Sequence, residues 1–107
     1  LIRRIPKGVE VEKVPSDNPE LISKLLAKKG CNKVLWECGP LLATSAIKSG
    51  CIQEIITFIS PKILGGTNSM NPFCDFKFRK MNEVIKLNDL RFSLIGDDMC
   101  IKSTLKN

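Results

Sequence analysis

Apolar residues recur at helical spacing between residues 16 and 30, in the stretch "SDNPELISKLLAKKG". The apolar positions of this stretch are Leu21, Ile22, Leu25 and Leu26. Asp17 or Asn18 can serve as the N-cap, Pro19 suits the first helical position, and Gly30 suits the residue past the end. The pattern and its end signals together predict an amphipathic helix.

Shorter patterns predict further elements along the first two thirds of the chain. Alternation of valine with charged residues favours a strand at residues 9–14, and apolar runs favour strands at residues 33–37 and 54–60. Small residues closed by Gly50 predict a second helix at residues 41–49. Strand, helix, strand, helix, strand is the order of parallel βαβ units.

The last third of the chain has a different character. Residues 61–73 form a connection rich in Gly, Asn and Pro, and two extended runs then meet at "GDD", residues 96–98, which is typical of a hairpin. We therefore expect an α/β fold in which a βαβαβ unit is followed by an antiparallel hairpin. No repeat or linker divides the chain, so residues 1–107 are expected to form one domain segment.

Composition places the chain among cytoplasmic globular proteins. Hydrophobic residues make up 43% and charged residues 26%, and no run approaches the roughly 18 apolar residues of a membrane span. The first ten residues lack the apolar block of a signal peptide. The chain opens on Leu1 in the middle of a pattern, which favours the C-terminal part of a longer domain.

Missing residue types exclude several chemistries. The chain has no His and no Tyr, which excludes Ser-His and Cys-His nucleophilic pairs. Its five cysteines are odd in number and include no CxxC pair, which favours reduced thiols over disulfides or a zinc site. Any chemistry must therefore use a carboxylate, a lysine or a borrowed cofactor, and no catalytic residue can be named.

The formal net charge of +6 allows three interpretations. Basic residues can bind nucleic acid, but here they are spread along the chain without paired aromatic residues, and we expect no nucleic-acid role. A solvated basic surface is the ordinary interpretation. Attraction of a phosphorylated small molecule remains open.

The stretch "VLWECGPLLATSAIKSG" is the candidate functional site. Glu37 lies at the end of a predicted strand, directly before a helix, where open α/β sheets bind ligands. The candidate anion-binding residues at the helix start are Gly39, Pro40, Leu41, Leu42, Ala43, Thr44 and Ser45, with backbone N–H groups free from Leu41 to Ser45. The alternatives are a tight turn with close helix packing, and a Glu37 that only caps a neighbouring helix. Trp36 is expected in the core, and Cys38 is expected to pack.

These residues carry a resemblance to a known family. The stretch "KVLWECGPLLATSAIKSGCIQEIITFISPKILGG" resembles the signature of the riboflavin-biosynthesis pyrimidine reductases, and "LIGDDMCIKS" is similar to their terminal hairpin. The resemblance implies a dihydrofolate-reductase-like fold, here its C-terminal half. It implies NADPH-dependent reduction of 5-amino-6-(5-phosphoribosylamino)uracil, a phosphorylated small-molecule substrate, to the ribitylamino product.

The resemblance also implies site residues and assembly. Glu37 matches the carboxylate that touches substrate, and residues 39–45 match the segment that holds the NADP phosphates. Cys38 departs from the family pattern, which usually has glycine there. Reductase domains of this family generally pair, so a homodimer is expected. The family's domain is about twice this length, which leaves two hypotheses: the cofactor-side segment of a reductase, inactive alone, or a non-catalytic fragment or interaction module that keeps the half-sheet.

Overall fold

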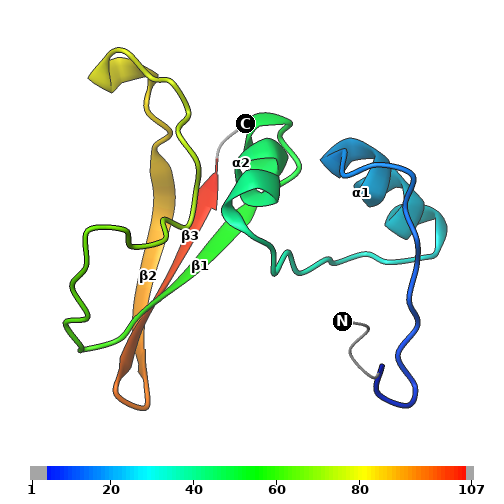
Figure 1. Cartoon of the computed structure of the whole chain (residues 1–107), viewed down its shortest axis with the longest axis horizontal. Coiled ribbons are helices and arrows are strands. Elements are labelled where there is room, and N and C mark those ends of the chain that lie inside the picture. Colours follow the sequence, from blue (N-terminus) through cyan, green and yellow to red (C-terminus); the bar gives the residue numbers. More distant parts are fainter. Residues whose placement is uncertain (1–4, 106–107) are drawn as a thin grey trace.

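A computed structural model of the chain describes residues 5–105 and shows a mixed α/β arrangement (Figure 1). The elements are α1 (Pro19–Lys28), α2 (Pro40–Lys48), β1 (Glu54–Ile59), the 3₁₀ turn η1 (Met81–Glu83), β2 (Leu87–Ile95) and β3 (Asp98–Leu105). Both predicted helices and the third predicted strand are present, each within one residue of its expected bounds. None of the helices between residues 5 and 105 has the length and apolar character needed to cross a bilayer.

Both helices begin and end as the local chemistry predicts. Asn18 is the N-cap of α1, and its side-chain oxygen accepts the backbone N–H of Leu21 at 3.1 Å. At the other end Gly30 adopts a positive φ of 85°, and the N–H of Cys31 returns to the carbonyl of Leu26 at 3.0 Å. Helix α2 ends in the same way around Gly50, whose φ is 70°. This is the Schellman arrangement, which needs the left-handed conformation that glycine adopts without strain.

The three strands form an antiparallel sheet in the order β1-β3-β2. Phe58 of β1 pairs with Cys100 of β3, and β2 turns into β3 at Gly96, whose φ is 60°. The predicted hairpin is therefore confirmed. A bulge interrupts β2 between Asn88 and Arg91, and there Asp89 has a φ of 49° and accepts the hydroxyl of Thr104 at 2.6 Å.

Two predicted strands are wrong, and so is the predicted parallel pairing. Residues 9–14 and 33–37 do not form strands, so among residues 5–105 β1 has no parallel neighbour and pairs with β3 alone, in the antiparallel direction. The physical reason is that a strand exists only when a neighbour completes its hydrogen bonds. Within residues 5–105 neither segment has such a neighbour. Residues 9–14 are instead tied to the end of α1 by an ion pair between Glu12 and Lys29, with 2.7 Å between Oε2 and Nζ.

The long connection from β1 to β2 is shaped by local turns. Gly65 and Gly66 have φ values of 69° and 118°, which only glycine tolerates well. Farther along, the side chain of Asp75 accepts the backbone N–H of Lys77 at 2.8 Å. This hydrogen bond, together with the Lys77 ammonium, holds the pKa of Asp75 below its ordinary value. The turn fixes the course of the chain just before Phe76 and Phe78.

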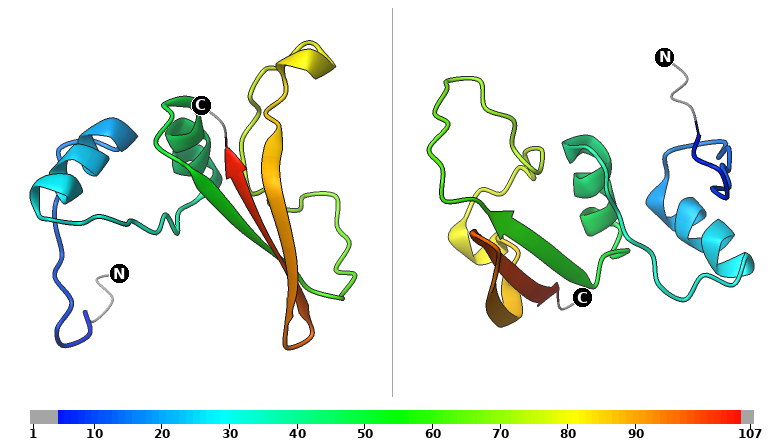
Figure 2. Two further views of the ribbon diagram at one scale, coloured as in Figure 1. Left: turned by 180° about the vertical axis from the view of Figure 1, so that it is seen from behind. Right: turned by 90° about the horizontal axis from the view of Figure 1, so that it is seen from below.

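The buried core of the described residues is small. Its buried members are Pro19, Thr44, Ala46, Cys100 and Ser103. The accessible surface is 9720 Å², whereas a compact protein of this mass has about 6,000 Å². The radius of gyration is 16.4 Å against about 13 Å for a compact domain of this length. Figure 2 shows the reason: α2 lies between α1 and the sheet, so the elements extend in a row and cover one another little.

Strand register brings five apolar side chains together on one face of the sheet, and four of them are exposed. Register places them together on neighbouring strands, because Ile59 pairs with Met99, Met99 with Leu94, and Ile101 with Phe92. We call Ile59, Phe92, Leu94, Met99 and Ile101 the apolar sheet face. Phe92 is 65% exposed and Leu94 is 76% exposed. Contiguous apolar surface of this kind marks a site of association.

We propose that a second copy of the chain covers the apolar sheet face and forms a homodimer. The excess surface is larger than the roughly 1,600 Å² that a standard interface buries. Phe92→Lys puts a charge into this face and is expected to shift the chain to monomer at micromolar concentration. Ser93→Lys adds the same charge on the opposite face and should leave assembly unchanged. Sedimentation equilibrium over a wide dilution series measures both, and a wild-type chain that stays monomeric throughout contradicts the proposal.

Candidate functional site

The N-terminus of α2 lacks a side-chain cap. Gly39 is the N-cap with an extended backbone, and Pro40, which has no N–H, takes the first helical position. The N–H of Ala43 already donates to the carbonyl of Gly39 at 3.0 Å. The helical pattern pairs the N–H groups of the next two residues in the same way. Free backbone donors are therefore limited to Leu41 and Leu42, which corrects the expectation of donors through Ser45.

Gly39 leaves room in front of these donors. Its φ of −70° suits any residue, and a Cβ added to it meets no atom of the chain within 4 Å. Neither backbone conformation nor packing within the described residues explains a glycine here. An open, uncapped helix start with two free donors fits a phosphate group, because the helix dipole favours negative charge at this end.

The two hydroxyl residues of the second turn of α2 have different environments. Thr44 is 5% exposed, and its Oγ1 accepts the backbone N–H of Cys74 at 2.8 Å. Ser45 is exposed. Of the two predicted hydroxyls, Ser45 is the one that a ligand in solvent can reach, whereas Thr44 is engaged with the long connection. Sequence reasoning missed this contact, since nothing in the chain signals a partner 30 residues away.

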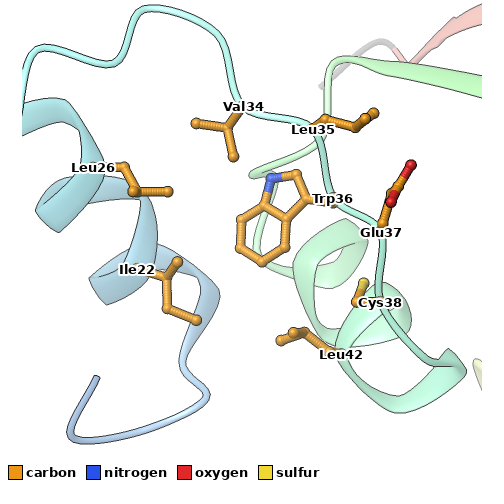
Figure 3. Close-up of a pocket in the computed structure, with 8 residues that line it drawn as sticks. All are labelled: Ile22, Leu26, Val34, Leu35, Trp36, Glu37, Cys38 and Leu42. Carbon is orange, nitrogen blue, oxygen red and sulfur yellow. The ribbon is translucent and has the colours of Figure 1, made fainter. Parts of the chain in front are cut away.

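A groove lies between the two helices, with residues 34–38 along its wall (Figure 3). Its volume is about 240 Å³, and its lining is mostly apolar, from Ile22 and Leu26 of α1, Leu42 of α2, and Val34, Leu35, Trp36, Glu37 and Cys38. Trp36 was expected in the core and is only half-buried here. Cys38 is half-buried beside Leu42, as expected for a packing residue.

Glu37 is the polar group at this groove. Its side chain is exposed and points away from Ile22 and Leu26 in Figure 3. Within residues 5–105 its carboxylate forms no hydrogen bond or ion pair, so it caps no neighbouring helix there. One residue separates it from Gly39. An acceptor and, four and five residues later, a pair of backbone donors thus follow each other along one short stretch of chain.

The site supplies binding groups and no complete proton-transfer machinery. Among residues 5–105 no three His, Cys, Asp or Glu side chains are grouped to hold a metal ion. All five cysteines are unpaired thiols. What the described geometry offers is an uncapped helix start with two free N–H groups, one exposed carboxylate and an apolar groove.

The groove predicts a measurable role for Leu26 as a neighbour of Trp36. Because Trp36 is the single tryptophan of the chain, Leu26→Ala should shift its emission to longer wavelength and raise its quenching by acrylamide. The loss of stability should stay below the roughly 2–5 kcal/mol of a fully buried Leu→Ala change, since Leu26 is half-buried. Lys24→Ala, on the exposed side of α1, is the control and should leave the emission unchanged. Equal spectra for all three proteins would contradict the groove.

Comparison with known proteins identifies the family. The model of the RibD C-terminal domain matches residues 7–101. The riboflavin biosynthesis protein PYRR, chloroplastic, of Arabidopsis thaliana is 35% identical over 100 residues, which cover 94% of this chain and 17% of that protein. The riboflavin biosynthesis protein RibD of Synechocystis is 38% identical over 80 residues, which cover 75% of this chain and 22% of that protein.

A solved structure supports the fold. Acinetobacter baumannii RibD, form 2, superposes with a TM-score of 0.70 at 20% identity, over 92% of this chain and 26% of that one. The expected dihydrofolate-reductase-like fold is thus confirmed. The chain spans about a fifth of the length of the two curated relatives. By the match over residues 7–101, the chain belongs to the RibD C-terminal domain family of riboflavin biosynthesis.

Proposed function

We propose that this chain forms the cofactor side of an NADPH-dependent reductase that converts 5-amino-6-(5-phosphoribosylamino)uracil to its ribitylamino product. Membership of the RibD C-terminal domain family supports the reaction class. The observation that carries the cofactor assignment is the uncapped start of α2, where Gly39 leaves open space before two free N–H groups.

Each residue of the site has a stated task in this proposal. The N–H groups of Leu41 and Leu42 bind a phosphate of NADPH. The exposed hydroxyl of Ser45, one turn farther along the helix on the side of Leu41, adds a hydrogen bond. Glu37 accepts a hydrogen bond from a polar group of the substrate. When bound, the cofactor supplies the hydride, so the chain is required only to bind and orient. This division of labour suits a chain without His or Tyr.

Cys38 is compatible with this arrangement. Its side chain lies in the groove beside Leu42, while the space in front of Gly39 is open. A Cβ at position 38 therefore points into the apolar groove. The departure from the family pattern at this position leaves close approach at Gly39 unobstructed.

We place the reaction in the cytoplasm. Five unpaired thiols fit a reducing compartment. The Arabidopsis relative is named as chloroplastic, so the alternative compartment is a plastid. Fractionation of the source cells with an antibody against the chain distinguishes the two.

Ser45→Glu tests the cofactor site. A carboxylate at position 45, one turn from the free donors, repels the phosphate. We expect NADPH affinity to fall severalfold, the equivalent of roughly 1 kcal/mol for unit charges a few ångströms apart in water. Position 45 is preferable to position 44, because Thr44 is buried. A charge there would be desolvated and would destabilise the packing of α2 against the long connection, whatever the ligand. Ser93→Glu, on the exposed sheet, makes the same change away from the site.

The measurement is titration of nicotinamide fluorescence against wild-type chain and both variants. Wild type and Ser93→Glu should bind alike. If Ser45→Glu binds NADPH as tightly as wild type does, the phosphate does not bind at the start of α2.

A second test concerns catalysis by the chain alone. About four fifths of the length of the curated relatives lies outside the matched region, and the described residues provide one substrate-facing carboxylate. We therefore expect no oxidation of NADPH that depends on the aminouracil substrate. Absorbance at the nicotinamide band follows the reaction, with a full-length RibD as positive control. Substrate-dependent turnover by this chain would show that it contains a complete site, and absent NADPH binding would favour the non-catalytic interaction module.

A further inference from the structure

One face of α2 holds the long connection between β1 and β2. Thr44 and Lys48 are four residues apart and therefore lie on the same side of the helix. The Oγ1 of Thr44 accepts the N–H of Cys74 at 2.8 Å. The Nζ of Lys48 lies 5.4 Å from the centroid of the Phe76 ring, within the range of a cation–π contact. We call Thr44, Lys48, Cys74 and Phe76 the α2 seam.

Ring contacts and one side-chain hydrogen bond hold the connection where it meets the seam. The rings of Phe73 and Phe76 lie 6.2 Å apart, and those of Phe76 and Phe78 are stacked at 5.3 Å with an angle of 2° between planes. The turn at Asp75 fixes the chain between Cys74 and Phe76. By contrast, every residue from 61 to 72 is exposed. The seam is therefore the place at which a largely uncovered connection is attached to a helix.

Burial makes the Thr44 contact the stronger half of the seam. Thr44 is 5% exposed, so loss of its oxygen leaves the N–H of Cys74 in a partly buried site without an acceptor. An unpaired buried donor costs more than the hydrogen bond contributes when formed. Lys48 is exposed, and its contact with Phe76 adds a smaller amount.

We propose that Thr44 is a positioning residue that, with Lys48, fixes residues 73–78 on α2 so that the connection and the helix move as one unit. One part of the proposal rests on the proposed function: a phosphate bound at the first turn of α2 stabilises the turn that contains Thr44, and so strengthens the seam. By linkage, an intact seam strengthens phosphate binding by the same factor. The ligand-facing hydroxyl is then that of Ser45, and the hydroxyl of Thr44 serves the protein itself.

Amide hydrogen exchange on the intact chain tests the seam. Thr44→Val keeps the shape of the side chain and removes the acceptor, and Thr44→Ser keeps the hydroxyl. We expect Thr44→Val to speed exchange at the amide of Cys74 by about three- to tenfold, in line with the net value of one hydrogen bond. Thr44→Ser should exchange like wild type. Wild-type exchange in Thr44→Val, or fast exchange in Thr44→Ser, overturns the proposal.

A pair of lysine variants covers the case in which Thr44→Val unfolds. Lys48→Met keeps the aliphatic stem and removes the charge from the ring of Phe76, and Lys28→Met makes the same change in the last turn of α1. Exchange within residues 73–78 should rise in Lys48→Met and stay unchanged in Lys28→Met, while the amides of β1 and β3 stay protected in both. Equal exchange rates within residues 73–78 in the two variants would overturn the proposal that Lys48 helps to fix the connection on α2.

NADPH separates this inference from the proposed function. Added NADPH should slow exchange at Cys74 in wild type and leave Thr44→Val unaffected. If NADPH fails to bind at all, the proposed function falls and the exchange results without ligand still decide the seam. If NADPH binds without protecting Cys74, the coupling is overturned.

Discussion

The pairing of β3 with both of its neighbours is the constraint on which the described structure depends. Cys100 and Ser103, two of the few buried residues between residues 5 and 105, lie on this strand. The N–H of Leu105 donates to the carbonyl of Gln53 at 2.9 Å, which continues the pairing beyond the start of β1. Because only a few residues separate the end of α2 from β1, this pairing also fixes the position of the C-terminal end of α2 relative to the sheet. The sheet thus anchors α2 at its C-terminal end, and α2 presents the candidate phosphate site at its other end.

Local signals in the sequence predict the ends of elements well, because the interactions that form them are local. The N-cap Asn18, the left-handed glycines Gly30 and Gly50, and the turn at Gly96 all act within four or five residues. Strands at residues 9–14 and 33–37 were predicted from alternation alone. Alternation shows that a segment fits a sheet, whereas pairing requires a neighbour that no local pattern supplies. The antiparallel direction of β1 is non-local for the same reason.

In the candidate site, too, the local features could be predicted from the sequence and the non-local ones could not. Its location, at a glycine and a proline before a run of small residues, could be predicted because a helix start is a local structure. The number of free donors is smaller than expected, since the helix pairs its own N–H groups from Ala43 onward. The burial of Thr44 depends on Cys74, 30 residues away, and no pattern around either residue predicts it. The identity of the ligand came from the resemblance and not from the residues, because an open helix start accepts any suitable anion.

The two edge strands of the sheet, β1 and β2, differ in how well they could pair with another chain. This difference affects how rigidly the sheet supports α2 and the candidate site. The edge of β2 is interrupted by a bulge beside Arg91, a device that discourages pairing with another chain. The edge of β1 is straight, and from Ile55 to Ile59 it has no charged residue. Full burial of one large apolar side chain contributes about 1.5–3 kcal/mol, and a domain has only about 5–15 kcal/mol of net stability. Covering β1 and the apolar sheet face would therefore raise the free energy of unfolding by a large fraction of its total. Because β1 follows α2 closely in the chain, a more stable sheet would also hold the two backbone donors of α2 more rigidly. Any partner that covers these surfaces, a second copy or a further part of a reductase domain, is thus expected to raise affinity at the start of α2 without touching the ligand.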